Sequence, residues 1–407
     1  MSAGSYLEPD AAPVDWESRG SLALANPEWA RRQADGLAGI ERRLPALEAH
    51  IWVSTSGTSS LVPGRVRWIA LSKAAFLASA RAVNGHLDAG RSDVWAHALP
   101  TFHVGGLGIL ARGWLSGARV VPAVIGKWNA DRFHAVAVRE RATLSALVPS
   151  QVHDLVAAGL ASPPSMRAIV VGGARMGAAL YERARALGWP CLPSYGLTET
   201  CSQVATAALS SLSATGRPAV LPVLSHAEIR SDDAQRLAIR ATSLLTCCAE
   251  VNEHGARVWD PKQDGWLLTE DTGRVGPGGV EVFGRLSESV KVLGEIVSLP
   301  RVEDQAWRWA TRENLRALAG FDLAVVAPSH DRLGHEVVLA IACRAPMDAV
   351  RRSAIVESVD TDSRDHLLPF ERVRRVVFVD EIPRTPLGKC RRVLLTRQVG
   401  EQAGADR

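Results

Sequence analysis

Short apolar runs that end in turn residues alternate with longer, alanine-rich segments over the first half of the chain. Such runs occupy residues 51–53, 119–122 and 168–171, and the last precedes two glycines and an alanine-rich stretch at 176–187. Buried strands that alternate with helices are typical of α/β folds with largely parallel sheets. The pattern predicts a large α/β unit whose ligand sites lie in the loops after the strands.

The pattern changes near residue 227, where short strand-like segments follow one another between turns. Segments 237–240, 266–269 and 280–283 predict a β-rich subdomain. Beyond residue 285 we expect helices near 302–318 and 347–360, with strands near 323–326, 337–343 and 375–379. The chain should therefore form two domains, 1–285 and 286–407, the second a small α+β domain.

The composition limits the classes of protein to which this chain can belong. With 407 residues, 47% of them hydrophobic, it can bury more than one core. A formal charge of +4 from dispersed basic residues does not indicate a nucleic-acid surface. The six cysteines lack the spacing of a zinc site or a disulfide framework, and no signal peptide or membrane span is expected. A cytoplasmic protein with reduced thiols fits this composition best.

A loop rich in hydroxyl groups follows the first apolar run. Residues 54–60 read Ser-Thr-Ser-Gly-Thr-Ser-Ser. Hydroxyls and exposed amides in such a loop can surround phosphate oxygens, because glycine lets the backbone approach an anion closely. A flexible linker would have a similar composition, and the loop lacks the ending of a Walker A motif.

Two later segments contain groups suited to the rest of a nucleotide. Residues 194–199 read Ser-Tyr-Gly-Leu-Thr-Glu, which offers a ring for stacking and a carboxylate for Mg²⁺ beside phosphate. Asp271 can accept both hydroxyls of a ribose, and Arg285 can pair with phosphate or ribose oxygens. The alternatives are a turn with Tyr195 in the core, and a hairpin with a surface ion pair.

Near the C-terminus, one lysine follows a stiffened turn. Residues 383–389 read Pro-Arg-Thr-Pro-Leu-Gly-Lys. Proline fixes φ and glycine permits tight geometry, so the turn can present the ammonium group of Lys389 at a defined point. A solvated lysine on an ordinary turn is the alternative interpretation.

The order of these segments resembles that in the adenylate-forming (ANL) superfamily of acyl-CoA synthetases, adenylation domains and luciferases. The resemblance runs from about Trp52 to Arg392 and is most specific at 194–199, at 284–285 with 291–295, and at 383–389. Segments 99–108 and 144–151 look most like the o-succinylbenzoate-CoA ligases of menaquinone biosynthesis. The resemblance implies the ANL fold, with a mobile C-terminal domain that carries the catalytic lysine.

In that superfamily a carboxylate attacks the α-phosphate of Mg-ATP, which gives acyl-AMP and pyrophosphate. The C-terminal domain then rotates, and CoA attacks the acyl-adenylate. ATP, Mg²⁺ and CoA are therefore the implied cofactors and co-substrate. The resemblance assigns nucleotide binding to Thr55, Ser56, Gly57, Thr58, Tyr195, Gly196, Asp271 and Arg285. It assigns catalysis to Lys389, Thr198 and Glu199, the last as the support for Mg²⁺.

The resemblance also implies an acyl pocket. His103 would lie at its mouth, and Gly172 and Gly173 along its wall. A second substrate carboxylate needs a buried cation, and Arg112, nine residues after His103 on a predicted helix, is the candidate. His103 could equally be structural, and Arg112 could lie on a solvated helix face. Lys291 and Gly294 would belong to the loop used in thioester formation.

Some residues depart from the superfamily pattern. Ser60 and Arg65 alter the phosphate loop, and Ser287 stands at the usual hinge position. These departures put pyrophosphate handling and domain rotation in doubt. Two other functions therefore stay open: an adenylation enzyme that loads a carrier protein, and a non-catalytic nucleotide- or acyl-binding protein. The expected partners are a small carboxylic acid, ATP and CoA, with no nucleic acid and no membrane; a homodimer is left open.

Overall fold

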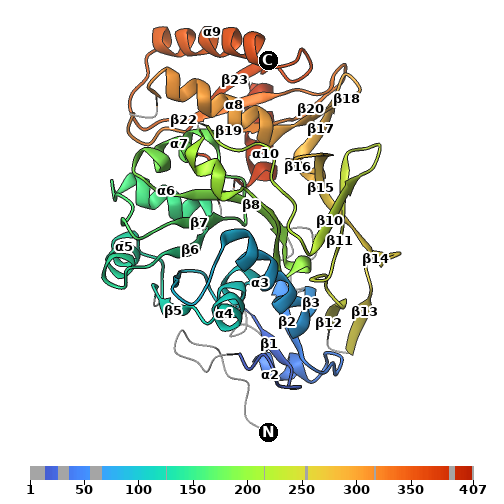
Figure 1. Ribbon diagram of the computed structural model, residues 1–407. Helices are drawn as coiled ribbons and strands as arrows, with labels where there is room; N and C mark the ends of the chain where they lie inside the picture. The colour runs from blue at the N-terminus through green and yellow to red at the C-terminus, as the bar shows by residue number, and fades with distance from the viewer. Residues whose placement is uncertain are drawn as a thin grey trace.

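The computed structural model describes residues 14–25, 36–55, 67–124, 126–214, 216–252, 255–315, 318–384 and 390–405. The segments up to β16 form the larger part of the molecule, and those from β17 onward lie beyond it at one end (Figure 1). None of the helices in these described ranges combines the length and the apolar character that crossing a bilayer demands. The architecture is mixed α/β with several sheets, as predicted.

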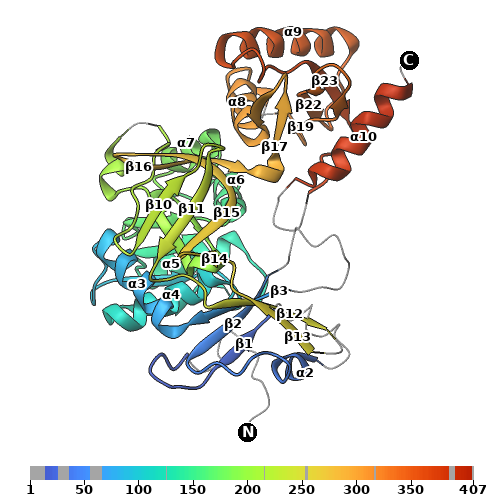
Figure 2. The ribbon, with the colours of Figure 1, turned by 90° about the vertical axis from the view of Figure 1, so that its right-hand side faces the viewer.

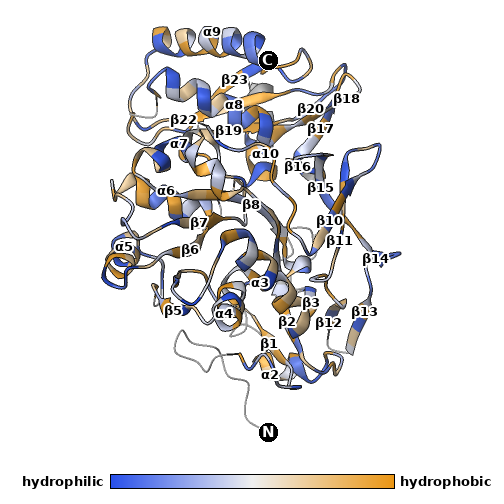
Figure 3. Ribbon diagram, in the orientation of Figure 1, coloured by the Kyte–Doolittle hydropathy of each residue, from blue (hydrophilic) through white to orange (hydrophobic). Residues whose placement is uncertain are grey.

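The larger part is built on a sheet in which β5, β4, β6, β7 and β8 run parallel, with β9 antiparallel to β8 at the edge. Its inner strands are apolar on both faces because helices cover both. Helices α3 and α4 pack on one face through Val83 and Ile109, and α5, α6 and α7 pack on the other through Phe133 and Val152. Hydrophobic colouring follows these inner strands, whereas the covering helices show both colours (Figure 3). The elements are β4 (Val94–His97), β5 (Arg119–Pro122), β6 (Leu144–Leu147), β7 (Ala168–Val171), β8 (Cys191–Leu197), β9 (Ser202–Thr206), α3 (Lys73–Leu87), α4 (Val104–Ser116), α5 (Ala130–Arg139), α6 (Pro149–Ala157) and α7 (Ala178–Ala186).

A second sheet has the order β1-β2-β3-β12-β13. The short helix α2 lies between β1 and β2 in the sequence. Only the β1–β2 pair is parallel, and the other pairs are antiparallel. The apolar run at 51–53 therefore lies in β2, which pairs parallel with β1 and antiparallel with β3. The elements are β1 (Leu22–Leu24), α2 (Gly36–Glu41), β2 (His50–Thr55), β3 (Arg67–Ser72), β12 (Cys247–Asn252) and β13 (Gly255–Trp259).

The third sheet is antiparallel and contains the three strand segments predicted for the β-rich subdomain. Its order is β10-β11-β15-β14, and β16 pairs with β15. The long hairpin of β15 and β16 brings Asp271 opposite Arg285. The elements are β10 (Ala227–Ser231), β11 (Arg236–Ala241), β14 (Lys262–Gln263), β15 (Trp266–Gly276) and β16 (Gly279–Arg285), with the 3-10 turns η1 (Thr198–Thr200) and η2 (Leu209–Ser213) earlier in the chain.

The segments after β16 have hydrophobic clusters of their own, drawn from residues 290–399. They form a small α+β unit with a β19-β22-β23 sheet, and α10 extends away from it (Figure 2). The predicted boundary at 285/286 stays a prediction. The elements are η3 (Leu286–Glu288), β17 (Ser289–Val292), β18 (Glu295–Ser298), α8 (Leu299–Arg312), β19 (Asp322–Val326), β20 (Ser329–His330), β21 (Gly334–His335), β22 (Val338–Ala342), α9 (Ala349–His366), β23 (Arg375–Val379) and α10 (Arg392–Ala405).

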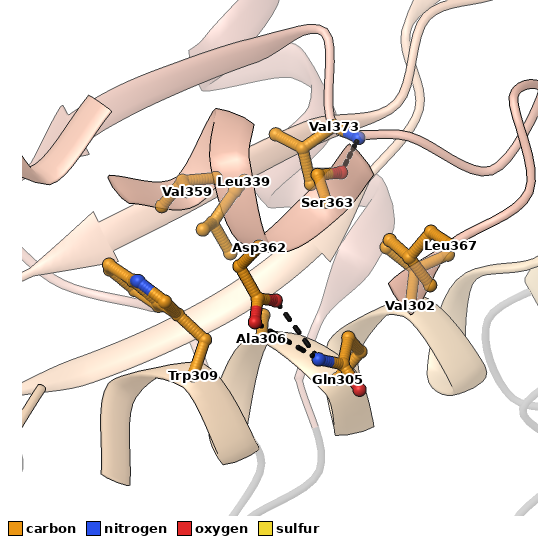
Figure 4. Close-up of a pocket in the computed structure, with 10 residues that line it drawn as sticks. All are labelled: Val302, Gln305, Ala306, Trp309, Leu339, Val359, Asp362, Ser363, Leu367 and Val373. Carbon is orange, nitrogen blue, oxygen red and sulfur yellow. Dashed lines mark hydrogen bonds between the residues drawn. The ribbon is translucent and has the colours of Figure 1, made fainter. Parts of the chain in front are cut away.

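Polar side chains join α8 to α9 above the small sheet. The Gln305 amide donates to both carboxylate oxygens of Asp362, at 3.3 and 3.0 Å, and the Trp309 indole donates to Ser358. A cavity of about 10 Å³ lies beside this contact, lined largely by apolar side chains (Figure 4). That is close to the smallest space that holds one water molecule, so the cavity is a packing defect and no ligand site.

A buried carboxylate on α8 connects the two parts of the chain. Arg175, in the loop after β7, places Nη2 2.9 Å from Asp304 Oδ2, and Arg217 Nη2 lies 3.8 Å from the same oxygen. Arg175 also donates to the carbonyl oxygens of Val282 and Phe283 on β16. The orientation of α8 against the larger part is therefore held by an ionic contact.

Candidate functional site

Three of the predicted nucleotide residues meet at one point. The Tyr195 hydroxyl, on β8, donates to Asp271 Oδ2 at 2.9 Å, and Arg285 Nε lies 3.6 Å from Asp271 Oδ1. The β15–β16 register places Asp271 and Arg285 opposite each other, and β8 brings Tyr195 to them from a different sheet. Residues far apart in the sequence therefore form one contiguous group.

Burial governs the charges in this group. Desolvation raises the pKa of Asp271, although the Tyr195 hydrogen bond and Arg285 act in the opposite direction, and nearby Glu199 adds to the increase. Desolvation and the Asp271 carboxylate raise the pKa of Tyr195 well above its usual value. Tyr195 thus remains a neutral donor at physiological pH, and Asp271 keeps one oxygen beside Arg285.

The Tyr195 ring itself lies in the hydrophobic core and is 9% exposed. Packing of this ring on adenine therefore stays a prediction, and what the structure adds is the hydroxyl contact to Asp271. Gly196, the next residue, is needed for close packing. A Cβ on it would lie 1.9 Å from the carbonyl oxygen of Ser202. Only glycine lets β8 run this close to β9 before the chain turns into η1.

The turn η1 presents Thr198 and Glu199 at the carboxyl end of β8, where the parallel sheet is expected to hold ligands. The Thr200 side chain stabilises this turn by accepting a hydrogen bond from the Leu197 amide at 3.0 Å. Glu199 Oε1 lies 3.3 Å from Arg67 Nη2, and its side chain is 19% exposed. The carboxylate therefore faces a guanidinium group that the sequence analysis did not single out.

These groups fit a metal that arrives with a nucleotide. No set of three or more His, Cys, Asp or Glu side chains that could hold a metal ion occurs within the described ranges. Mg²⁺ in nucleotide sites is commonly held by one or two carboxylates together with substrate phosphates. A single carboxylate at Glu199, beside the Thr198 hydroxyl, suits that arrangement better than a resident ion.

Part of the predicted site falls outside the described residues. Ser56, Gly57 and Thr58 of the phosphate loop, the altered positions Ser60 and Arg65, and Lys389 all lie there. Thr55 is the last residue of β2 and pairs in register with Arg67, the first residue of β3. The two strands therefore bring the ends of the phosphate-loop segment together beside η1.

Arg112 lies in the core and not on a solvated helix face. It is 1% exposed, its Nη2 donates to Gln203 Oε1 at 2.7 Å, and its guanidinium lies 5.4 Å from the centre of the Trp95 ring. Its Nε and Nη1 atoms are buried and have no hydrogen-bond partner among the described residues. Desolvation lowers the pKa of Arg112 to about 10, so the group stays charged at neutral pH. A buried cation without a carboxylate partner is costly, which favours an anion as its ligand.

His103 and Arg112 do not form one cluster. His103 is the N-cap residue of α4 and is exposed, whereas Arg112 lies nine residues further on and is buried. Nine residues correspond to roughly 13 Å along a helix and half a turn around it. Protein atoms around the His103 imidazole lower its pKa by desolvation, so the neutral form is favoured.

The two glycines after β7 have different roles in the fold. A Cβ on Gly172 would come within 2.8 Å of the Ser194 hydroxyl, so glycine allows the loop to lie against β8. Gly173 has a φ of 78°, which favours glycine for its backbone conformation. Both features are compatible with a pocket wall, and that role stays a prediction.

Lys291 and Gly294 lie on the β17–β18 hairpin of the smaller unit. Lys291 is exposed, and its carbonyl oxygen lies 3.2 Å from His335 Nδ1. Gly294 occupies the tight turn with a φ of 89°, next to Leu293 with a φ of 54°. The structure does not bring this hairpin into the group around Asp271, and a part in thioester formation stays a prediction.

Sequence reasoning missed two polar residues that the structure places at the site. Arg67 is a lone cation at the start of an otherwise apolar strand, and Gln203 is a polar residue among small and apolar neighbours in β9. Gln203 is buried and Arg67 is partly buried, so each needs a polar partner, and this interruption of an apolar run was the available signal. Arg67 contacts Glu199, and Gln203 contacts Arg112.

A family model described as AMP-binding enzyme matches residues 53–238. The chain is 26% identical over 327 residues to a 2-succinylbenzoate–CoA ligase of Bacillus pumilus, a match that covers 76% of this chain and 62% of that protein. A 2-succinylbenzoate–CoA ligase of Staphylococcus aureus is 36% identical over 130 residues, covering 32% of this chain and 26% of that protein. The chain thus spans between about a quarter and three fifths of the curated relatives it matches.

The fold is similar to that of solved o-succinylbenzoate coenzyme A synthetases from Bacillus subtilis. One, in complex with ATP and magnesium ion, has a TM-score of 0.70 at 20% identity and covers 92% of this chain and 79% of its own. Another, in complex with the acyl-adenylate intermediate, has a TM-score of 0.67 at 23% identity, and the match covers 85% of this chain and 68% of that one. The chain thus has the fold of these adenylate-forming enzymes, contains a segment that matches the AMP-binding enzyme family, and is similar in sequence to 2-succinylbenzoate–CoA ligases.

Proposed function

We propose that the chain catalyses the ATP-dependent ligation of a carboxylic acid to CoA, with o-succinylbenzoate as the acid. The reaction has two steps: the acid attacks the α-phosphate of ATP, pyrophosphate leaves, and the CoA thiol then displaces AMP from the acyl-adenylate. The observation that carries this proposal is the convergence of Tyr195, Asp271 and Arg285 beside Glu199. In an enzyme of this kind, positioning and charge stabilisation supply most of the rate.

Each residue has a role in the proposal. Asp271 takes the ribose hydroxyls, with Tyr195 and Arg285 fixing its carboxylate. Thr55 and the loop after it hold the outer phosphates, and Glu199 and Thr198 face them. Mg²⁺, when bound with ATP, neutralises phosphate charge. Lys389 bridges the acid and the α-phosphate, so that charge developing between them is stabilised.

In this proposal the positive charge of Arg112 selects an acid with a second carboxylate. O-succinylbenzoate carries a second carboxylate, and the unpaired guanidinium of Arg112 supports an anionic group at that end of the pocket. An acid that reaches Arg112 must displace the Gln203 side chain, which now accepts its hydrogen bond. His103, Gly172 and Gly173 would border the path. A cytoplasmic location is a further prediction that belongs to this proposal.

A screen for pyrophosphate release over mono- and dicarboxylic acids, with and without CoA, tests the function. The proposal predicts ATP-dependent release with o-succinylbenzoate and formation of its CoA thioester. Release without use of CoA, together with acyl transfer to a carrier protein, would favour the carrier-loading alternative. Nucleotide binding with no pyrophosphate release for any acid would favour a non-catalytic binding protein.

A further inference from the structure

Arg67 lies at the base of the phosphate loop. It pairs in register with Thr55, and the sequence segment predicted to bind phosphate lies between these two residues. Its guanidinium contacts Cys248 and Trp259: Nη2 donates to the Cys248 thiol at 3.0 Å, and Cζ lies 5.8 Å from the centre of the Trp259 ring. Cys248 is fully buried on β12, the strand next to β3. These contacts fix the position of the Arg67 side chain.

From this position Arg67 approaches the carboxylate that the proposed function gives to the metal. Arg67 Nη2 lies 3.3 Å from Glu199 Oε1, and the two side chains are 33% and 19% exposed. Charge-assisted N–H···O bonds are typically about 2.7–2.9 Å long, so this ion pair is looser than an optimal one. Partial exposure of both groups leaves the pair accessible to a competing ion.

A metal ion and a guanidinium compete for the same charge on Glu199. Two cations beside one carboxylate repel each other, and the repulsion is strongest where water is partly excluded. Arg67 therefore disfavours a metal ion at Glu199, and when no metal is bound its own charge offsets that of nearby nucleotide phosphates.

We propose that Arg67 is a positioning residue that holds the Glu199 carboxylate and competes with Mg²⁺ for it. The proposal rests on the proposed function, in which Glu199 supports Mg²⁺. Its consequence is that Arg67 compensates for a missing metal: it offsets phosphate charge when Mg²⁺ is absent and opposes the metal when it is present.

The test measures binding of α,β-methylene-ATP by calorimetry, once with Mg²⁺ and once with EDTA. The quantity compared is the ratio of Kd in EDTA to Kd in Mg²⁺. Arg67→Gln should raise this ratio at least threefold, because binding without metal loses its cation and binding with metal loses its competitor. Arg67→Lys keeps the charge and should leave the ratio within about a factor of two of wild type.

If the Kd ratio of Arg67→Gln equals that of wild type, the proposal is overturned. It is also overturned if Arg67→Lys and Arg67→Gln give the same Kd ratio, because the shape of the side chain and not its charge would then be responsible. Thermal unfolding without nucleotide checks that each variant folds. If Arg67→Gln does not fold, Arg67→Met keeps the apolar stem near Trp259 and carries the same expectation. Glu199→Gln should bring the ratio close to one; a wild-type ratio there would remove Glu199 from the metal site, which is a failure of the proposed function and not of Arg67's charge effect.

Discussion

Individual side chains at the site have more than one contact, which limits how each can be tested. Tyr195 packs its ring in the core while its hydroxyl holds Asp271, and Arg112 is buried with only part of its hydrogen-bonding capacity used. Alanine at either position would leave a cavity as well as remove a polar contact. Substitutions that preserve volume separate the two effects.

Tyr195→Phe removes only the hydroxyl that donates to Asp271. A hydrogen bond to a charged group contributes about 1.5–3 kcal/mol, so we expect ATP to bind roughly tenfold more weakly or worse. Equilibrium binding of ATP measures this directly. Tyr181→Phe is the matched control, because the buried Tyr181 hydroxyl has no hydrogen-bond partner in the described chain. Equal loss of affinity in both variants would contradict a role for the Tyr195 hydroxyl.

Arg112→Met removes the buried charge while keeping most of the volume. The KM for o-succinylbenzoate should increase at least tenfold, and the KM for ATP should change little, because the guanidinium would contact only the acid. Steady-state kinetics with each substrate varied in turn measures both values. Equal increases for the two substrates would exclude Arg112 from the acid pocket. Replacing a buried, unpaired charge with an apolar side chain should not lower the thermal stability of the chain.

Lys389→Ala should abolish formation of the acyl-adenylate and leave ATP binding largely intact. The physical reason is that the ammonium group of this lysine would act on charge that develops only during the displacement. Rapid-quench detection of acyl-AMP, with ATP binding measured beside it, checks the prediction. Lys291→Ala provides a lysine control on the same unit. Normal adenylation in Lys389→Ala would contradict the proposed mechanism.

At the scale of elements, the parallel sheet is joined at its amino end by one carboxylate. Asp93, just before β4, accepts two hydrogen bonds from Arg167 at 2.8 Å and one from Thr143 at 2.7 Å. These residues precede β7 and β6, so one side chain fixes the starts of three strands. The site lies at the opposite ends of these strands, and this contact should therefore affect stability and not catalysis.

Asp93→Asn should lower the free energy of unfolding by about 2 kcal/mol at pH 7, because it leaves the partly exposed guanidinium of Arg167 without its charge partner. Burial by itself would raise the pKa of Asp93. The hydrogen bonds from Arg167, Gly90 and Thr143 outweigh this effect and lower the pKa below its usual value. The stabilisation is then fully present above the unfolded pKa of roughly 3.9, and it is lost as pH falls through the lower folded value.

Urea unfolding between pH 7 and pH 3 measures this difference. The difference between the two proteins should become smaller toward the acid end of that range. Glu228→Gln is the control, because its ion pair with Arg240 is exposed on both sides and should contribute less than about 1 kcal/mol. A difference for Asp93→Asn that is independent of pH would contradict the assignment to its charge.

Which elements could be predicted from sequence depended on where their partners lie. The apolar runs at 119–122, 168–171 and 375–379 became β5, β7 and β23 with the expected bounds, because each is a short run rich in β-branched residues. The run at 51–53 became β2, which lies in a mainly antiparallel sheet. In that sheet β2 pairs with β3, and β3 pairs with β12. The β3–β12 pairing joins residues some 180 positions apart, and a local sequence pattern contains no information on it.

The candidate site shows the same limit. The motif residues Tyr195, Asp271 and Arg285 were found because their chemistry suggested a ligand, and the structure brings them into contact. Arg67 and Gln203 were missed because each acts on another side chain and not on a ligand. Their importance arises from contacts between elements that are distant in the sequence, which a one-dimensional pattern does not contain.

At the scale of the whole molecule, the joint between the two parts is ionic. Asp304 on α8 is 9% exposed at its side chain and meets Arg175 and Arg217 from the larger part. A Cβ on Gly177 would lie 3.2 Å from Asp304 Oδ1, so the two surfaces are closely apposed. If the smaller unit must rotate between the two steps of the reaction, this contact has to break.

Asp304→Asn should therefore loosen the joint without unfolding either part. Hydrogen exchange at the start of α7 and along the facing turns of α8 should become at least severalfold faster, because the charge that both arginines contact is gone. Mass spectrometry of exchanged peptides measures this. Asp362→Asn alters the opposite side of α8, toward α9, and should speed exchange there while leaving α7 unchanged. Unchanged exchange at α7 in Asp304→Asn would show that the contact does not hold the two parts together.

The Asp304 contact makes the molecule respond to its salt environment in two opposite ways. Screening weakens ion pairs, with a Debye length of about 8 Å at physiological ionic strength, whereas sulfate and phosphate salts strengthen apolar burial. Rising sulfate should thus stiffen the hydrophobic clusters on either side of α8 while it frees the joint between them. Ionic strength would then set how readily the two parts change their arrangement without altering the parts themselves.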